Sequence, residues 1–258
     1  MIRALALCAF VLSLAILTWA PSAGAQMRTS AAYTGTSDLS DVRPFQAWVT
    51  DAVFTRGVDV EPELRLQDFD GGQVLIAGAR SAVWLRDDTE VGVHWGFASF
   101  DPDRGDGDTG LRDLDVYGRY RLDVRGDLDM AIGSEISLPV GDESIGAGSF
   151  DFRGFGAVRY DIDGNMTLIG SAGLESLERF DDRELGIFFG AGTLVPLTEE
   201  TTLIAELNLS TASDAAQLTG GVDFELPPGG HLRAALALGL DDDAPNYELI
   251  LGFAIPVY

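Results

Sequence analysis

The chain has 258 residues and a formal net charge of −24, because 41 acidic residues outnumber 17 basic ones. All 17 are arginine, and the sequence contains no lysine. A chain this acidic is repelled by nucleic acid and by anionic lipid headgroups, so neither is expected as a partner. An acidic, solubilising surface does not account for the 46% of residues that are hydrophobic, so the fold must account for them.

The first 25 residues have the features of a secretory signal peptide. Arg3 precedes an apolar stretch over residues 4–20, and small residues then offer a cleavage site near Ala25. This site favours a cleaved signal peptide over the alternative, a membrane anchor helix. The only cysteine, Cys8, lies in this segment, so the mature protein is expected to be exported without any disulfide.

Residues 26–57 come next and show no clear periodicity. Residues 44–48 and 53–54 are largely apolar, but they fit neither a helical nor a strand pattern. Three roles stay open for this part of the chain: a periplasmic segment, a partial plug or an extra strand.

From residue 58 onward, apolar and polar residues alternate in segments of about ten residues, which predicts β-strands. None of these segments has the roughly 18 apolar residues that a transmembrane helix needs. The predicted strands cover residues 58–68, 73–85, 89–99, 112–123, 126–138, 149–161, 165–175, 184–195, 201–211, 215–225, 231–240 and 246–257.

The hairpin over residues 114–136 shows the two faces most clearly. A turn at residues 123–126 separates two strands that each have one apolar and one polar face. The side chains expected to face lipid are Leu114, Val116, Leu122, Leu128, Met130, Ile132 and Ile136.

Connector lengths indicate how the strands are arranged. Tight turns alternate with mostly longer, acidic connectors such as residues 100–111, 139–148 and 176–183. Outer-membrane barrels have short periplasmic turns and longer external loops, whereas sandwiches mix both lengths at each end. We therefore predict an all-β fold, a transmembrane antiparallel up-and-down β-barrel of about 12 strands over residues 58–258. The expected location is the outer membrane of a Gram-negative bacterium.

The polar faces of these strands would line the barrel lumen. Two interpretations stay open: the basic residues Arg119, Arg121, Arg153 and Arg159 could oppose an acidic wall and orient solutes, or lumen salt bridges could fill and stiffen the barrel. Glu206, Asp223, Glu225 and Glu248 would form that acidic wall. The predicted lumen-lining residues are Asp115, Tyr117, Arg119, Arg121, Glu135, Asp151, Arg153, Arg159, Glu206, Asp223, Glu225 and Arg233.

The connector over residues 101–108 carries four aspartates, Asp101, Asp103, Asp106 and Asp108. Carboxylate oxygens are the ligands that calcium prefers, so a calcium site in this external loop is one possibility. The register differs from that of the twelve-residue EF-hand loop and no glutamate closes it, so a solvated loop is the alternative. No other metal or cofactor is expected.

Two stretches resemble a known family. Residues 110–122, GLRDLDVYGRYRL, resemble a strand of outer-membrane proteins assigned to the MetA pathway of phenol degradation. Residues 137–142, SLPVGD, are similar to that family's strand exit, with Val140 replacing the usual threonine, and Glu206 lies like a glutamate on a family strand. The resemblance covers roughly residues 110–258. It implies a transporter barrel that takes up aromatic or other hydrophobic compounds.

Known catalytic motifs are absent from the sequence. No Gly-x-Ser-x-Gly elbow, His-Glu-x-x-His motif or phosphate-binding loop occurs, and the two histidines, His94 and His231, are far apart in the chain. We expect no enzyme but a monomeric channel or transporter whose partners are outer-membrane lipid and a small-molecule solute. A non-conducting structural barrel, a lipid-modifying barrel enzyme and a soluble periplasmic β protein are the alternatives.

Overall fold

The computed structural model describes residues 39–54, 57–123, 127–162, 166–179, 182–227 and 229–257. The predicted signal peptide and its cleavage site lie outside these residues. Among them, no helix is long and apolar enough to cross a membrane. The elements are η1 (Leu39–Asp41), β1 (Val58–Phe69), β2 (Gly72–Arg86), β3 (Thr89–Pro102), β4 (Asp108–Leu111), β5 (Leu114–Leu122), β6 (Leu128–Leu138), β7 (Asp151–Ile162), β8 (Met166–Arg179), β9 (Asp182–Pro196), β10 (Thr201–Ser210), β11 (Ala215–Leu226), β12 (Gly230–Gly239) and β13 (Tyr247–Val257).

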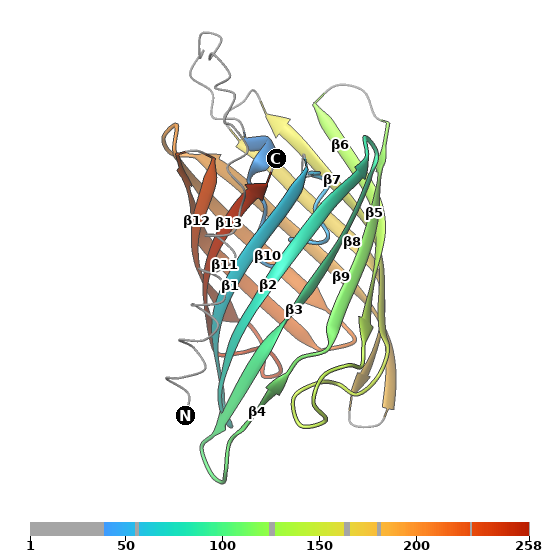
Figure 1. The fold of residues 1–258 in the computed structure, drawn as a ribbon, viewed down its shortest axis with the longest axis vertical. Helices are drawn as coiled ribbons and strands as arrows, with labels where there is room; N and C mark the ends of the chain where they lie inside the picture. The colour runs from blue at the N-terminus through green and yellow to red at the C-terminus, as the bar shows by residue number, and fades with distance from the viewer. Residues whose placement is uncertain are drawn as a thin grey trace. The chain divides into compact units, whose positions relative to one another are not determined.

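Twelve of these strands close into a single antiparallel barrel, which confirms the predicted fold class (Figure 1). Each strand pairs with the next one along the chain, and β1 pairs with β13 to complete the ring. Closure gives each of the twelve strands two partners, so the ring has no edge strand, as a sheet in hydrocarbon requires. We call the rim where β1 begins and β13 ends the terminal rim, and the opposite one the loop rim.

Two connectors predicted to be long loops are largely strand instead. β3 runs on to Pro102 and β4 folds back against it, with the hydroxyls of Ser99 and Thr109 2.9 Å apart. β8 and β9 likewise extend to residues 179 and 182, where Glu178 and Arg183 form an ion pair of 2.9 Å. The loop prediction was wrong because it treated acidic residues as breaks, whereas strands with both faces in water can carry charge on either side.

The two faces of the wall differ sharply in polarity. Large apolar side chains such as Ile132 and Ile136 are 50% and 41% exposed on the outside, whereas Tyr117 and Arg119 are each 2% exposed on the inside. A soluble protein buries its apolar side chains and exposes its charged ones. The reverse arrangement is that of barrels whose outer face contacts hydrocarbon.

The hydrophobic core lies within the lumen, around residues 39–54, which we call the plug. Leu39, Val42 and Phe45 of the plug form one buried cluster with four residues of the wall, Leu194, Ile204, Ala235 and Ile250. Trp48 packs against Ala82 and Tyr117, and Phe54 packs against Ala131 and Phe155. Three aromatic side chains thus fix the plug to strands on different sides of the barrel.

Candidate functional site

Four arginines of the wall bind the main chain of the plug. Each guanidinium donates hydrogen bonds to plug carbonyls near the terminal rim, where backbone acceptors would otherwise be buried without partners. The bonds run from Arg80 to Phe45 O (2.9 Å), from Arg119 to Val49 O (3.2 Å) and Asp51 O (2.6 Å), from Arg159 to Val42 O (3.1 Å) and Leu39 O, and from Arg233 to Arg43 O.

Glu206 of β10 binds amide groups of the plug, whereas the arginines bind its carbonyls. Its carboxylate accepts hydrogen bonds from the amides of Phe45, Gln46 and Ala47 at 2.5, 3.1 and 3.0 Å. A carboxylate that accepts several backbone N–H groups satisfies donors that neither lipid nor the strands could satisfy. The plug is therefore held by donors on four strands spread around the ring, β2, β5, β7 and β12, and by an acceptor on β10.

The buried carboxylate of Glu90 on β3 links the plug to the wall. Its carboxylate pairs with Arg43 of the plug (2.9 Å) and with Arg119 of the wall (2.6 Å), and it accepts the hydroxyl of Tyr117 (3.0 Å). Burial lowers the pKa of Arg43, but Glu90 and its neighbours more than offset this, so that pKa lies above its usual value. The guanidinium of Arg43 is therefore charged inside the barrel.

Replacing Glu90 by alanine is expected to lower the free energy of unfolding by about 3–5 kcal/mol, because two buried arginines lose their shared partner. Urea unfolding in detergent or lipid measures this change in the free energy of unfolding. Glu199, an exposed residue in the β9–β10 turn, gives the matched control Glu199→Ala, which should change stability by less than about 0.5 kcal/mol. Equal stability of the two variants would contradict the role assigned to Glu90.

The Phe45 ring packs on a glycine of the wall, just as aromatic rings of the wall pack on glycines of neighbouring strands. In three cross-strand pairs, an aromatic ring lies so close to a glycine that an added Cβ would be 2.3–2.5 Å from the ring. The Phe45 ring lies over Gly221 of β11 in the same way, at 2.5 Å from such a Cβ. The wall pairs are Tyr117 with Gly92, Phe155 with Gly133 and Phe188 with Gly173.

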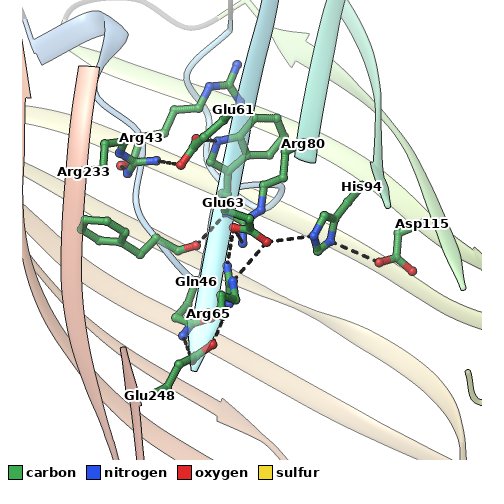
Figure 2. A network of polar contacts seen from close by, with 12 residues as sticks. Arg43, Gln46, Glu61, Glu63, Arg65, Arg80, His94, Asp115, Arg233 and Glu248 are labelled. Atoms are coloured by element: carbon green, nitrogen blue, oxygen red, sulfur yellow. Dashed lines mark hydrogen bonds and ion pairs between the residues drawn. The ribbon is translucent and has the colours of Figure 1, made fainter. Parts of the chain in front are cut away.

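A chain of polar contacts runs along the inner face of the wall from β5 to β13, on the loop-rim side of the plug (Figure 2). His94 bridges Asp115 of β5 (3.4 Å) and Glu63 of β1 (2.9 Å). Glu63 pairs with Arg65 (3.1 Å), which in turn pairs with Glu248 of β13 (3.1 Å). The amide side chain of Gln46 joins this chain, since it donates to Glu248 at 2.6 Å and accepts from Arg65 at 3.2 Å.

Two adjoining cavities lie between the plug and the loop rim, and we call them together the vestibule. Their volumes are about 280 and 300 Å³, and both are lined by Asp115, Glu135 and Arg153. Trp48 and Thr50 of the plug line the deeper cavity. The side chain of Arg153 is 34% exposed, so water reaches the vestibule. This space could hold a small solute above the plug.

The structure places the predicted lumen residues in four settings. Those buried inside the barrel are Tyr117, Arg119, Arg159, Glu206, Asp223 and Arg233. Those that line the vestibule are Asp115, Glu135, Asp151 and Arg153. Arg121 stacks on the ring of Phe54 at 4.6 Å, and Glu225 is exposed at the terminal rim.

The suggested field between a basic and an acidic wall does not occur around the plug. Arg119 pairs with Glu90, Arg159 pairs with Asp51 of the plug at 3.0 Å, and Glu206 binds plug amides. Neighbouring groups thus neutralise one another, because Arg119 and Glu90 are partners on paired strands and the plug supplies Asp51 to Arg159. Around the plug, the arrangement is that of the second interpretation, in which salt bridges fill the lumen.

Four lumen carboxylates were missed in the sequence: those of Glu61, Glu63 and Glu175, each about 2–6% exposed, and that of Asp59, which lies 3.8 Å from Arg43. Glu61 receives hydrogen bonds from Trp48 (2.8 Å) and Arg233 (2.6 Å). The signal was present, since Glu61 and Glu63 have the same two-residue phase as Arg65. Pro62 between them interrupted the pattern.

The four aspartates of the predicted calcium loop lie at the end of β3, in the β3–β4 turn and at the start of β4, and all four are exposed. In the described part of the chain, no three histidine, cysteine or acidic side chains are grouped so as to hold a metal ion. The calcium site stays a prediction. A calcium titration that raises the Tm would support it, and an unchanged Tm would contradict it.

Both histidines have carboxylate partners, and neither lies beside a candidate nucleophile in these contacts. His231 bonds to Asp223 at 2.7 Å near the terminal rim, whereas His94 lies in the chain of contacts above the plug. The expectation that the protein is not an enzyme stays a prediction.

Comparison with known proteins yields structural likeness only. No family model and no curated protein matches the sequence. An outer membrane channel from Pseudomonas putida F1 superposes with a TM-score of 0.62 at 10% identity, over 80% of this chain and 97% of that one. The KdgM porin in complex with disordered oligogalacturonate gives 0.58 at 8%, over 78% and 99%. The toluene transporter TbuX from Ralstonia pickettii gives 0.50 at 8%, over 85% and 93%. The chain is therefore similar in fold to outer-membrane channels and porins.

Proposed function

We propose that the protein is an outer-membrane channel for small polar solutes, and that the plug closes its lumen. The observation that carries this proposal is that the plug is not part of the wall. Its main chain is bound by side chains of the lumen, beneath a vestibule that water reaches. A segment held in this way can leave without breaking any strand pairing.

The apolar outer face supports the location, because exposing it to water would cost about 25 cal/mol per Å². The closed wall has no free edge for a second copy to extend, which supports a monomer surrounded by lipid. Both remain part of the proposal.

The vestibule favours polar solutes over hydrocarbons. Carboxylates, the guanidiniums of Arg80, Arg112 and Arg153, and the amides of Gln46, Asn208 and Gln217 line it. An apolar solute would leave these groups without hydrogen-bond partners, at a cost of about 1–3 kcal/mol each. Uptake of aromatic compounds, which the family resemblance implies, therefore has less support from the geometry.

Removing the aromatic anchors of the plug is expected to open the channel. The double variant Phe45→Ala/Trp48→Ala, which we call the anchor variant, should weaken plug binding by about 3–5 kcal/mol per ring. Each 1.4 kcal/mol changes the ratio of closed to open channels by a factor of ten. Single-channel recording in planar bilayers should show a mostly closed wild type and a mostly open variant.

The matched control is Phe97→Ala/Tyr160→Ala, which removes two rings that are 45% and 47% exposed on the outer face. It should behave like the wild type. Heat-modifiable gel migration verifies that each barrel is folded. A folded anchor variant that passes no current would contradict the channel and favour a structural barrel.

A further inference from the structure

The plug is bound as a receptor binds a peptide ligand. Within residues 39–54, main-chain groups bond to one another at a single point, from Val42 N to Leu39 O at 3.2 Å. Six carbonyls and three amides of the plug bond instead to side chains of the lumen. The five side chains that do so are Arg80, Arg119, Arg159, Arg233 and Glu206.

These contacts are made to main-chain carbonyl and amide groups, which every peptide has. A carbonyl acceptor and an amide donor recur at each residue, so the recognition depends little on sequence. Side-chain selection comes chiefly from the aromatic positions, where Phe45 and Trp48 are each 1% exposed, with ion pairs at Arg43 and Asp51 beside them. A different peptide with aromatic residues at the same spacing could make most of the same contacts.

The charge balance of the lumen also points to a peptide. Arg80, Arg119 and Arg233 already have carboxylates of the wall as partners, Glu63 at 3.1 Å, Glu90 at 2.6 Å and Glu61 at 2.6 Å. When the plug leaves, their remaining N–H groups need neutral acceptors rather than further anions. Peptide carbonyls are such acceptors.

Arg159 differs from the other three arginines. The only ion pair it forms among the described residues is with Asp51, which belongs to the plug itself. A ligand that replaces the plug would therefore gain from one carboxylate at this position. A peptide supplies it through its C-terminus or through an acidic side chain.

We propose that the lumen is a peptide-binding site, and that short peptides with aromatic side chains compete with the plug for it. Such peptides are then solutes of this channel. The inference rests on the proposed function, because it requires a plug that can leave.

The test uses the full-length Phe45→Ala/Trp48→Ala variant in detergent and a fluorescein-labelled synthetic peptide, LSDVRPFQAWVTDAVF, which corresponds to residues 39–54. Fluorescence anisotropy should show saturable binding to the variant, and binding at least about tenfold weaker to the wild type, whose own plug occupies the site. An unlabelled tetrapeptide, Phe-Ser-Gly-Trp, should displace the labelled peptide.

Two modified peptides separate main-chain recognition from adsorption. N-methylation of the amides at Gln46 and Ala47 removes donors to Glu206 and should weaken binding about tenfold or more. Alanine in place of both aromatic residues should weaken it at least as much. Equal binding of the N-methylated peptide, no saturable binding to the folded variant, or no displacement by Phe-Ser-Gly-Trp would overturn the proposal.

The readout is independent of conductance. A variant that conducts but binds no peptide would contradict this inference and leave the channel in place. A variant that binds the peptide without ever conducting would contradict the proposed channel alone.

Discussion

A disulfide between the plug and the wall is expected to abolish the current that the anchor variant passes. The Cβ of Ala47 lies 3.9 Å from the position of a Cβ added to Gly190 of β9. Disulfides have Cβ–Cβ distances of about 3.5–4.5 Å, so Ala47→Cys/Gly190→Cys can form one. Added to Phe45→Ala/Trp48→Ala, the pair should keep the channel closed when oxidised and open when reduced.

The geometry at Gly190 allows this substitution. The new Cβ would approach Ser171 Oγ at 2.6 Å and Asn208 Oδ1 at 3.0 Å, and both are ends of side chains that can rotate away. No other thiol interferes, because Cys8, in the predicted signal peptide, is the only cysteine of the chain.

Each molecule is its own control, since dithiothreitol added to the bilayer should restore the current. The single variants Ala47→Cys and Gly190→Cys, in the same background, should conduct under both conditions. If the oxidised pair conducts as well as the reduced one, ions do not pass the position of the plug and the proposed gate is wrong.

The strands could be predicted because their signal is local. All twelve predicted segments are strands, and most boundaries agree within two residues, since each strand shows its own alternation of lipid-facing and lumen-facing side chains. β10 is an example: Leu203, Leu207 and Leu209 point outward, and Glu206 points inward.

For residues 26–57 a partial plug stayed one of three possible roles, because the partners of this segment are distant in sequence. Phe45 bonds to Glu206, 161 residues away, and Val42 bonds to Arg159, 117 residues away. A segment that takes its hydrogen bonds from a surrounding wall needs no periodicity of its own. The ion pairs between lumen side chains could not be predicted either, because they depend on which side chains the barrel brings together.

The open channel is expected to prefer cations. The outer cavity of the vestibule is lined by the carboxylates of Asp113, Asp115, Glu135 and Asp151 against only two guanidiniums, those of Arg112 and Arg153. A ring of carboxylates in a confined aqueous space attracts cations and repels anions. In a KCl gradient, the reversal potential of the anchor variant should lie toward the K⁺ equilibrium potential.

Neutralising the two carboxylates that both cavities share should remove most of this preference. Asp115→Asn/Glu135→Gln in the anchor background leaves the volume of the vestibule almost unchanged, so conductance should persist while selectivity falls. The matched control, Asp106→Asn, neutralises an exposed carboxylate in the β3–β4 turn and should have little effect. Since the Debye length falls from about 10 Å at 0.1 M salt to about 3 Å at 1 M, the preference should also weaken at high salt. Anion preference, or a reversal potential that the double variant leaves unchanged, would show that the vestibule does not control which ions pass.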